Sequence, residues 1–507
     1  MAARLDQVLT LAYQLDADVA ARAAAARGDP ARLVAVADLL AAVLGDRLPQ
    51  VPPPAAATWT PLPAQAAPPP AARAAAVADL LAWAEAGGAR FDSVRFTVDA
   101  AGHCSATAAR DLAAGEAVVV VPRALMIFED ELASSAAGQI SPYGNLRVSM
   151  DTLATWLALE ADLPASPWRA FLAALPRSFP TSPWFRDLDE QRALAGTAAA
   201  TAAATEVDVA HDFHALLDPE LPVSLAAFAW GRAITRSRGY RVTVDGRERC
   251  ALIPVVDLLD HQPGDTTWDY QPDQAAYVVT TARAIAAGEP VHATYGFHDN
   301  GALLRGYGFA LDDNPADTAR LRFAPSRNVR AEVLAASLWR FAPGAASVEV
   351  AARADLGLHR ALWLLRLRHA DGGALHAAAA SGQLSDRGVG WLGVATEVAA
   401  LAELAATARA GVVELDAAAP PPGTSPWARA CDQVRAGERA TLTAVADFAD
   451  AARDVLAAAP SLTELRAAAA PHAAATTGTH AGARYMLAGY LAAVADELAR
   501  ESSTDVA

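Results

Sequence analysis

The chain has 507 residues, and 53% of them are hydrophobic, largely because alanine is abundant. This length allows two or three domains with at least one sizeable core, and the alanine content favours closely packed helices. The formal net charge of −16 argues against a nucleic-acid backbone or an anionic membrane as the main partner, because clustered Lys and Arg hold such partners. We therefore expect a protein partner that binds through a basic segment, and no nucleic acid or membrane.

The cysteines and the first residues predict a cytoplasmic protein. Cys104, Cys250 and Cys431 are odd in number, far apart and never in a C-x-x-C arrangement, which fits neither a disulfide framework nor a cysteine-rich zinc site. The opening stretch MAARLDQVLTLAYQLDADV carries three Asp and no continuous apolar core, unlike a secretory signal or a transit peptide. No apolar run is long enough to span a bilayer.

Helical spacing opens the chain. Apolar residues recur at intervals of three and four from Leu5 to Val19 and from Leu33 to Val43, with Asp29-Pro30 as a cap and first-turn pair for the second helix. The sequence therefore predicts a helical hairpin over residues 1–48. Residues 49–75 are rich in Pro and Ala with almost no charge, which predicts an extended linker.

Strand patterns then begin within a main domain expected over residues 76–312. Short runs of alternating or β-branched residues predict a small β fold. Two segments of the same layout, RDLAAGEAV (Arg110–Val118) and RAIAAGEPV (Arg283–Val291), each place Gly-Glu at a tight turn that should lead into a strand. The strand-like runs are Val94–Val98, Val118–Val121, Ala251–Val256 and Tyr277–Thr281.

Helical spacing interrupts the β fold and then closes the chain. Residues from about 129 to 235 return to helical spacing, for example at Leu153 and Leu157, which predicts a helical insert. Nearly everything from residue 313 to 507 has helical spacing as well, which predicts an all-helical second domain. The expected fold class is therefore α+β.

Three segments then carry a specific resemblance. SRGY (Ser237–Tyr240), ALIPVVDLLDH (Ala251–His261) and ATYGFHDNGALLRGYGF (Ala293–Phe309) resemble, in order and spacing, the core of the SET-domain methyltransferases. The resemblance is to the branch that contains the Rubisco large-subunit methyltransferases and the actin-histidine methyltransferase, and it covers roughly residues 80 to 450.

The resemblance implies both a fold and an activity. The fold would be a SET domain, with small β-sheets and a knot-like core split by the helical insert, followed by helices that bind a protein substrate. The activity would be methyl transfer from S-adenosyl-L-methionine to a lysine side chain of a protein, with histidine as a variant in the same branch.

The same resemblance assigns roles to individual residues. Tyr295 matches the catalytic tyrosine, whose hydroxyl orients the incoming amine, although a tyrosine before glycine is often only packed at a strand end. Arg238 matches the arginine that meets the methionine carboxylate of the donor, a task suited to a planar fork of donors. Tyr240 and Tyr307 match aromatic residues of the substrate channel, and core packing is the alternative for both.

Two departures from the family pattern stand out. Asp260-His261 replaces Asn-His, so an amide that donates and accepts becomes a carboxylate that only accepts. Asp260 and His261 are still expected to bind the donor, through its ammonium group and adenine, and Asp260→Asn is expected to tighten binding. The Gly-x-Gly loop aligns with residues 103–106, so Ser105 and Ala106 would approach the donor there unless Gly102 takes over the role of a lost glycine.

These departures leave a second function open. The chain would then be a catalytically impaired SET-like protein that binds a peptide or acts as a scaffold. His211 and His214 have the spacing of metal ligands on a helix, but no third ligand accompanies them and no metal is predicted. The sequence contains no G-x-S-x-G elbow, P-loop or dinucleotide fingerprint.

Overall fold

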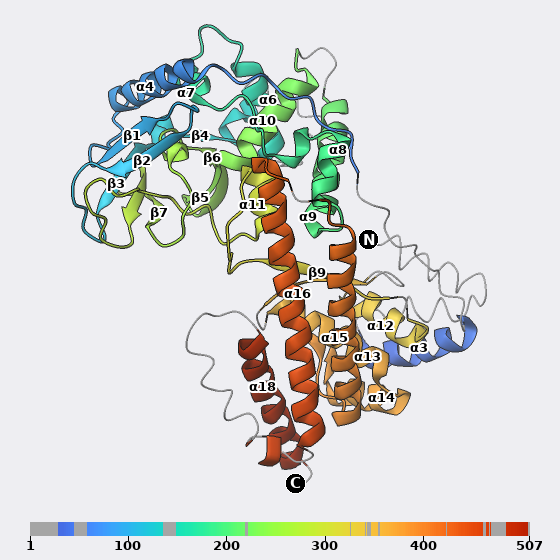
Figure 1. Cartoon of the computed structure of the whole chain (residues 1–507). Helices are drawn as coiled ribbons and strands as arrows, with labels where there is room; N and C mark the ends of the chain where they lie inside the picture. Colours follow the sequence, from blue (N-terminus) through green and yellow to red (C-terminus); the bar gives the residue numbers. More distant parts are fainter. Residues whose placement is uncertain are drawn as a thin grey trace.

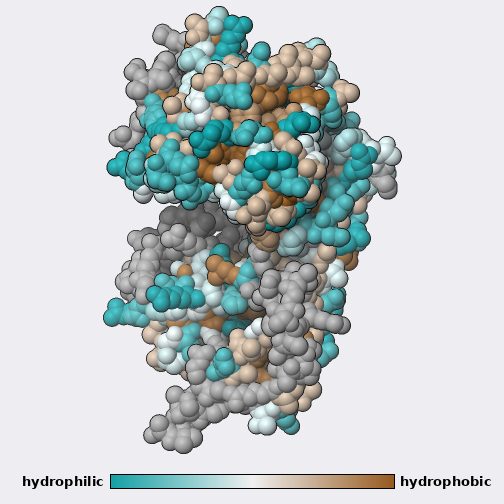
Figure 2. All heavy atoms as spheres, turned by 90° about the vertical axis from the view of Figure 1, so that its left-hand side faces the viewer, coloured by the Kyte–Doolittle hydropathy of each residue, from teal (hydrophilic) through white to brown (hydrophobic). Residues whose placement is uncertain are grey.

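The computed structural model describes residues 29–44, 58–134, 149–217, 222–459, 463–465, 467 and 483–504, apart from residues 325, 340, 342–345, 353–354 and 422. Figure 1 shows a β-rich part with its helical insert at the top and a helical part below, and the long helix α16 (Pro426–Ala458) runs along both. Figure 2 shows a recess between the two parts, and hydrophobic side chains set among hydrophilic ones on one face of the β-rich part. None of the described helices is long and apolar enough to cross a membrane.

Small antiparallel sheets form the β-rich part, and burial explains their sequence patterns. β3 and β8 are nearly continuous apolar runs because almost all their side chains are buried, whereas β5 alternates because every second side chain is exposed. The predicted strand at Ala251–Val256 is shorter than expected, since β6 ends at Leu252 and a 3-10 turn, η5 (Val256–Leu258), follows. The sheets are β1 (Val94–Val98) with β2 (Cys104–Ala108); β3 (Ala117–Pro122), β8 (Ala276–Thr281) and β7 (Thr266–Gln271) in the order β3-β8-β7; and β4 (Ile127–Phe128), β6 (Arg247–Leu252) and β5 (Gly239–Val244) in the order β4-β6-β5.

The two similar segments lie against each other. Leu112 and Ile285 exchange backbone hydrogen bonds of 2.8 and 3.1 Å. Gly115 and Gly288 hold φ of +83° and +81°, the left-handed conformation that both tight turns require. The first turn leads into β3 as predicted, but the second leads only to an isolated bridge at Pro290, so the expected second strand is absent from this described segment.

The predicted helical insert is confirmed between β4 and β5. α6 and α10 pack at close range, because a Cβ at Gly231 would overlap the backbone carbonyl of Ala154. Gly231 thereby sets the position of α10, which extends beyond the predicted end at residue 235 to Arg238. The insert helices are α6 (Ser149–Glu160), α7 (Arg169–Ala174), α8 (Leu188–Gln191), α9 (Ala198–Ala215) and α10 (Leu225–Arg238), and α4 (Pro70–Ala86), which precedes β1, packs on α7.

The part that follows residue 313 is predominantly helical, as predicted, but not all-helical. β9 (Thr318–Arg322) pairs with β10 (Ser347–Ala351), and β11 (Leu384–Ser385) pairs with β12 (Gly388–Val389). Buried and less buried side chains alternate along β9, a period-two pattern that helical spacing around it concealed. The helices here are α12 (Val329–Trp339), α13 (Leu356–His369), α14 (Gly372–Ser381), α15 (Val394–Ala417), α16 and α18 (Ala483–Thr504).

The helix α3 (Pro30–Leu44) packs into this helical part, against α12 and α14 (Figure 1). It begins as predicted, because the carboxylate of Asp29 accepts hydrogen bonds from N–H groups of its first turn. Asp38 pairs with Arg330 and with His376, the latter at 2.7 Å. The preceding helix of the predicted hairpin lies outside the described residues. The buried face of α3 contains Leu33, Val34, Val36, Ala37 and Leu40.

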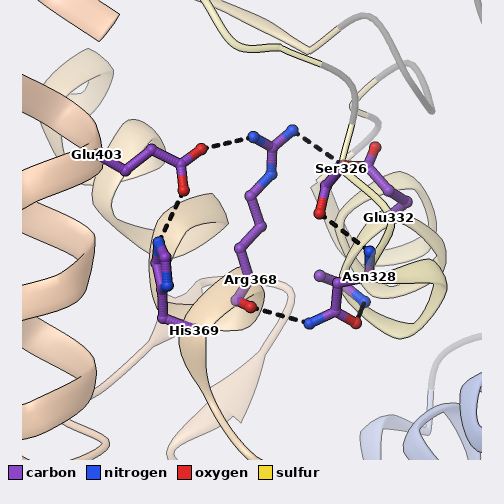
Figure 3. A network of polar contacts seen from close by, with 7 residues as sticks. Ser326, Asn328, Glu332, Arg368, His369 and Glu403 are labelled. Atoms are coloured by element: carbon purple, nitrogen blue, oxygen red, sulfur yellow. Dashed lines mark hydrogen bonds and ion pairs between the residues drawn. The ribbon is translucent and has the colours of Figure 1, made fainter. Parts of the chain in front are cut away.

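A buried polar network joins α12, α13 and α15 (Figure 3). Arg368 donates to Glu403 at 2.7 Å and to Glu332 at 2.9 Å, and His369 contacts the other oxygen of Glu403 at 2.7 Å. Asn328 donates to the backbone carbonyl of Arg368 at 2.9 Å. Because the Arg368 guanidinium is buried between two carboxylates, loss of either partner would leave a buried charge less well compensated.

The described end of the predicted linker is anchored rather than free. The backbone N–H of Trp59 donates to the Gln191 side chain at 3.1 Å, and the N–H of Leu62 donates to the carbonyl of Trp184 at 2.9 Å. Both Trp59 and Leu62 are buried. Residues 58–69 therefore have no regular structure but are held on the surface of the insert, whereas residues 70–75 of the predicted linker form the start of α4.

The two parts are joined where α16 meets the insert. Arg435 donates to the backbone carbonyl of Ala193 at 3.0 Å, and the carboxylate of Glu438 accepts from the N–H of Ala198, the first residue of α9, at 2.8 Å. The predicted domain boundary at residue 313 falls in the loop between α11 (Asn300–Tyr307) and β9. The first turns of α16 nevertheless share a hydrophobic cluster with the insert.

Stability should depend on pH through Glu438. Burial raises the pKa of its carboxyl from the ordinary 4.5 to about 7, so folding takes up a proton between these pH values. The stabilising contribution of the protonated group is therefore full below pH 4.5 and is lost as pH rises through about 7. We expect this residue to lower the free energy of unfolding by on the order of 3 kcal/mol over that range.

Denaturant unfolding across this pH range measures the effect. Glu438→Gln should flatten the profile, whereas Asp447→Asn, a change at an exposed carboxylate on the same helix, should leave it as in the wild type. Equal profiles for wild type and Glu438→Gln would contradict the assignment.

Candidate functional site

An aromatic cluster surrounds Tyr295, in the loop after β8. Its ring centroid lies 4.7 Å from that of Tyr307, 5.0 Å from that of His261 and 6.4 Å from that of Phe309. Tyr307 is the last residue of α11, and Gly308, with φ of +83°, reverses the chain so that Phe309 reaches the same cluster. The structure thus brings together Tyr295, His261 and Tyr307, which the sequence assigned separately.

Two hydrogen bonds join Tyr295 to the segment that follows η5. Its hydroxyl donates to the backbone carbonyl of Leu259 at 2.7 Å, and its backbone N–H donates to Nδ1 of His261 at 3.0 Å. Nδ1 of His261 therefore carries no proton, and burial, which lowers the pKa of this imidazole, favours the same neutral form. Burial also raises the pKa of Tyr295, so its hydroxyl stays protonated and acts as a dipole rather than as a base.

A buried charged cluster lies beside this tyrosine. Nε of Arg238, at the end of α10, is 3.4 Å from a carboxylate oxygen of Asp257 in η5. Burial raises the pKa of Asp257, while the charges of Arg238 and Arg73 lower it. The charges of Arg238 and Asp257 also act on the Tyr295 hydroxyl, so the cluster and the aromatic residues form one site.

Three atoms of this cluster have unused hydrogen-bonding capacity. Nη1 of Arg73, Nε of Arg238 and Oδ1 of Asp257 are buried and have no hydrogen-bond partner. Buried polar atoms without hydrogen-bond partners are rare and costly, so the two arginine atoms fit a polar ligand with an anionic group, whereas Oδ1 of Asp257 would need a donor. The same arrangement would suit the carboxylate of an amino-acid moiety.

Sequence reasoning missed Arg73 and Asp257 as members of this site. Arg73 lies in the first turn of the alanine-rich helix α4, where the helix dipole disfavours a cation. That misplaced charge is the signal that could have found it. Asp257 lies within the segment Ala251–His261 without a predicted role, and the structure pairs it with Arg238.

The backbone is strained immediately before Asp257. Val255 has φ of +72° and ψ of −46°, a tight γ-turn conformation that is unfavourable for a β-branched residue. Such strain persists only where the surroundings enforce it, and here Val255 is fully buried. The turn ends β6 sharply and carries Asp257 towards Arg238.

The predicted donor-binding residues near β2 and η5 lie in two different settings. Ser105 and Ala106 lie within β2 rather than in a loop, and the Ser105 hydroxyl bonds that of Thr97 across the hairpin at 3.2 Å. The β1–β2 turn relies on Gly102, with φ of +85°, as the sequence allowed. Asp260 follows η5, and its carboxylate is 3.0 Å from Nε2 of His103.

Tyr240 lies deeper than the other aromatic residues. It is 8% exposed, packs edge-on against Tyr277 and Trp268 with centroid distances of 5.7 and 5.9 Å, and belongs to the β-sheet core. Its contact with a substrate stays a prediction.

The two histidines with metal-ligand spacing contact backbone carbonyls. His211 reaches Thr60 at 3.3 Å and His214 reaches Val223 at 2.9 Å. In the part of the chain that the structure describes, no group of three His, Cys, Asp or Glu is arranged to hold a metal ion.

Comparison with known proteins gives sequence relatives among methyltransferases. No protein-family model matches the chain. Actin-histidine N-methyltransferase of Canis lupus familiaris is 27% identical over 281 residues, which are 51% of this chain and 47% of that protein. Ribosomal lysine N-methyltransferase set10 of Schizosaccharomyces pombe is 29% identical over 200 residues, 36% of either chain. The chain thus spans about half, or less, of the length of these relatives.

Solved structures show the fold. The SET domain of LSMT bound to lysine and AdoHcy superposes with a TM-score of 0.60 and 19% identity, over 75% of this chain and 92% of that one. Rubisco LSMT bound to AdoMet gives a TM-score of 0.58 at 19% identity, over 75% and 93% of the two chains. The expected resemblance is confirmed, and the chain has the SET-domain fold of the Rubisco large-subunit methyltransferase.

Proposed function

We propose that this protein is a protein N-methyltransferase that transfers a methyl group from S-adenosyl-L-methionine to a lysine side chain of a protein. The observation that carries the proposal is the position of a fixed tyrosine hydroxyl, that of Tyr295, beside buried arginine atoms that lack hydrogen-bond partners. Histidine is the alternative acceptor, since the relatives named above include one histidine and one lysine methyltransferase.

The residues of the charged cluster fit this cofactor. Arg238 and Arg73 would hold its carboxylate, which would supply partners for the buried Nε and Nη1 atoms. Asp260 would meet its ammonium group, His261 would lie against its adenine, and Ser105 and Ala106 would line its other side. When bound, the cofactor supplies an electrophilic methyl group on a sulfonium.

The remaining chemistry is positioning and removal of water. The carbonyl of Leu259 holds the Tyr295 hydroxyl, whose oxygen lone pairs are then directed to an incoming amine. Tyr307 and Phe309 provide apolar walls beside it. An ordinary lysine, with a pKa near 10.4, is only about one part in a thousand neutral near pH 7.4, and desolvation between these walls favours the neutral, nucleophilic amine.

The substrate is proposed to be a protein with a basic segment, which would complement the net charge of −16. The helical part with α12 to α16 is proposed to dock it, in a cytoplasmic protein. The rival function, a SET-like scaffold that has lost catalysis, was suggested by Asp260 and Ser105. The buried atoms of Arg73 and Arg238 without hydrogen-bond partners argue for a ligand in the cofactor position, and binding of the methyl donor decides between the two functions.

Arg238→Ala and Arg73→Ala should each weaken binding of S-adenosylhomocysteine by about 1–3 kcal/mol, because each removes a charge-assisted contact. Titration calorimetry measures the effect. Arg241→Ala, which removes an exposed arginine of β5, is the matched control and should bind as the wild type does.

Circular dichroism must accompany these titrations, since Arg238→Ala also leaves Asp257 less well compensated. A wild-type protein that does not bind at millimolar ligand would favour the scaffold function. Folded variants with wild-type affinity would instead exclude the charged cluster as the carboxylate site.

Tyr295→Phe should change donor affinity by less than about threefold and lower turnover by about a hundredfold or more, because the hydroxyl acts chiefly in the transition state. The measurement is transfer of labelled methyl groups to proteins of a cell extract depleted of this enzyme. Tyr270→Phe, which removes a hydroxyl from a buried tyrosine of β7, is the control. A discrete protein labelled equally by wild type and Tyr295→Phe would show that Tyr295 serves only packing.

A further inference from the structure

The two departures from the family pattern meet in space. His103 follows the turn between β1 and β2, Asp260 follows η5, and Nε2 of His103 lies 3.0 Å from Oδ2 of Asp260 although 157 residues separate them. The side chains are 61% and 39% exposed, so the contact lies at the surface of the site rather than in the core.

Hydrogen bonds within the β1–β2 turn fix the backbone of His103. Asp99 accepts from the backbone N–H of His103 at 2.9 Å and from that of Ala101 at 2.8 Å, and the N–H of Asp99 donates to the His103 carbonyl at 2.9 Å. Gly102, with its left-handed backbone, closes this turn. His103 is therefore presented to Asp260 by an ordered turn, not by a free loop.

A backbone hydrogen bond fixes Asp260 close to the candidate catalytic residue, Tyr295. The carbonyl of Asp260 accepts from the N–H of Ala293 at 2.8 Å, and the adjacent His261 accepts from the N–H of Tyr295 at 3.0 Å. A continuous series of contacts thus runs from the β1–β2 turn through Asp260 and His261 to Tyr295.

We propose that His103 and Asp260 act as one unit, a side-chain clasp in which His103 positions the Asp260 carboxylate to receive the ammonium group of the methyl donor. This inference rests on the proposed function. His103 belongs to the segment that aligns with the family's Gly-x-Gly loop, and Asp260 stands where the family has an asparagine, so the histidine supplies the donor that the lost amide would have supplied. Asp260 would touch the cofactor, and His103 is a positioning residue that acts through it.

Protonation of His103 should strengthen the clasp. The charged groups that face its imidazole are Asp260, Asp99 and Arg73. The hydrogen bond to Asp260 raises the pKa of His103 above 6.5, against the effects of burial and of Arg73. The charge-assisted form of the contact is therefore complete below pH 6.5 and is lost as pH rises through the folded-state pKa.

Calorimetry with S-adenosylhomocysteine tests the clasp in a double-mutant cycle. At about pH 6, His103→Ala and Asp260→Asn should each weaken binding by about threefold to fivefold, the upper range for a half-exposed ion pair. The double variant should bind no more weakly than the weaker single one. The sequence alone predicted tighter binding for Asp260→Asn, and the observed pair reverses that expectation.

The pH profile separates positioning from a merely structural role. Wild-type affinity should fall by about threefold between about pH 6 and about pH 8.5, as His103 loses its proton. His103→Gln keeps an N–H donor that does not titrate, so it should retain affinity and abolish the pH dependence. Circular dichroism confirms that each variant is folded.

Titration of the His103 resonances by NMR in the unliganded protein tests the pair without any ligand. The pKa of His103 should drop in Asp260→Asn, because the carboxylate that favours the imidazolium is gone. An unchanged pKa, or additive losses of affinity in the cycle, would overturn the clasp while the proposed function stands. If the wild type does not bind the ligand at all, the proposed function and the role of the clasp in donor binding both fail.

Discussion

The burial of the Asp257 carboxylate, which pairs with Arg238 and feels the charge of Arg73, is the constraint on which the candidate site depends. A carboxylate in this position loses its hydration, and burial alone would cost several kcal/mol. Arg238 and Arg73 compensate for that loss from two different helices, so the start of α4, the end of α10 and the strained turn at Val255 must meet at one point. Gly231 in turn sets the position of α10 against α6. The geometry around Tyr295 follows from this meeting rather than from any single motif.

Short sequence motifs identified the aromatic residues of the candidate site but not all the charged residues around them. Tyr295 and Tyr307 could be assigned because one contiguous segment contains them, and His261 because it ends a second short segment. The structure brings the three rings together. Arg238 was assigned from a short motif, whereas its partners Asp257 and Arg73 escaped notice because pairing across distant elements leaves no periodic signal. The fold was predictable for similar reasons, since alternation and helical spacing identified the main strands and the insert. β9 and β10 were missed because short strands among alanine-rich helices resemble their neighbours in composition.

The departures from the family pattern show how a residue can look unfavourable alone and reasonable in context. Asp260 loses a donor relative to asparagine, and His103 lies in a segment that lacks the glycines of the family's loop. Together they form a hydrogen bond that neither change could provide alone.

Contacts of α16 link the two parts of the molecule. Glu438 of α16 accepts from the first N–H group of α9, and Arg435 donates to a backbone carbonyl of the insert. The helical part is therefore not a separable appendage of the β-rich part.

The position of α3 bears on how the chain folds during synthesis. Asp38 and its partner Arg330 are 292 residues apart, and the apolar face of α3 is buried by elements that follow the whole β-rich part. At about 5–20 residues per second, a ribosome needs about 15 to 60 s between making the two residues. Throughout that interval the helices that bury the apolar face of α3 in the folded protein have not yet been made. The β-rich part can form first, and α3 completes the helical core only after the chain has returned to it.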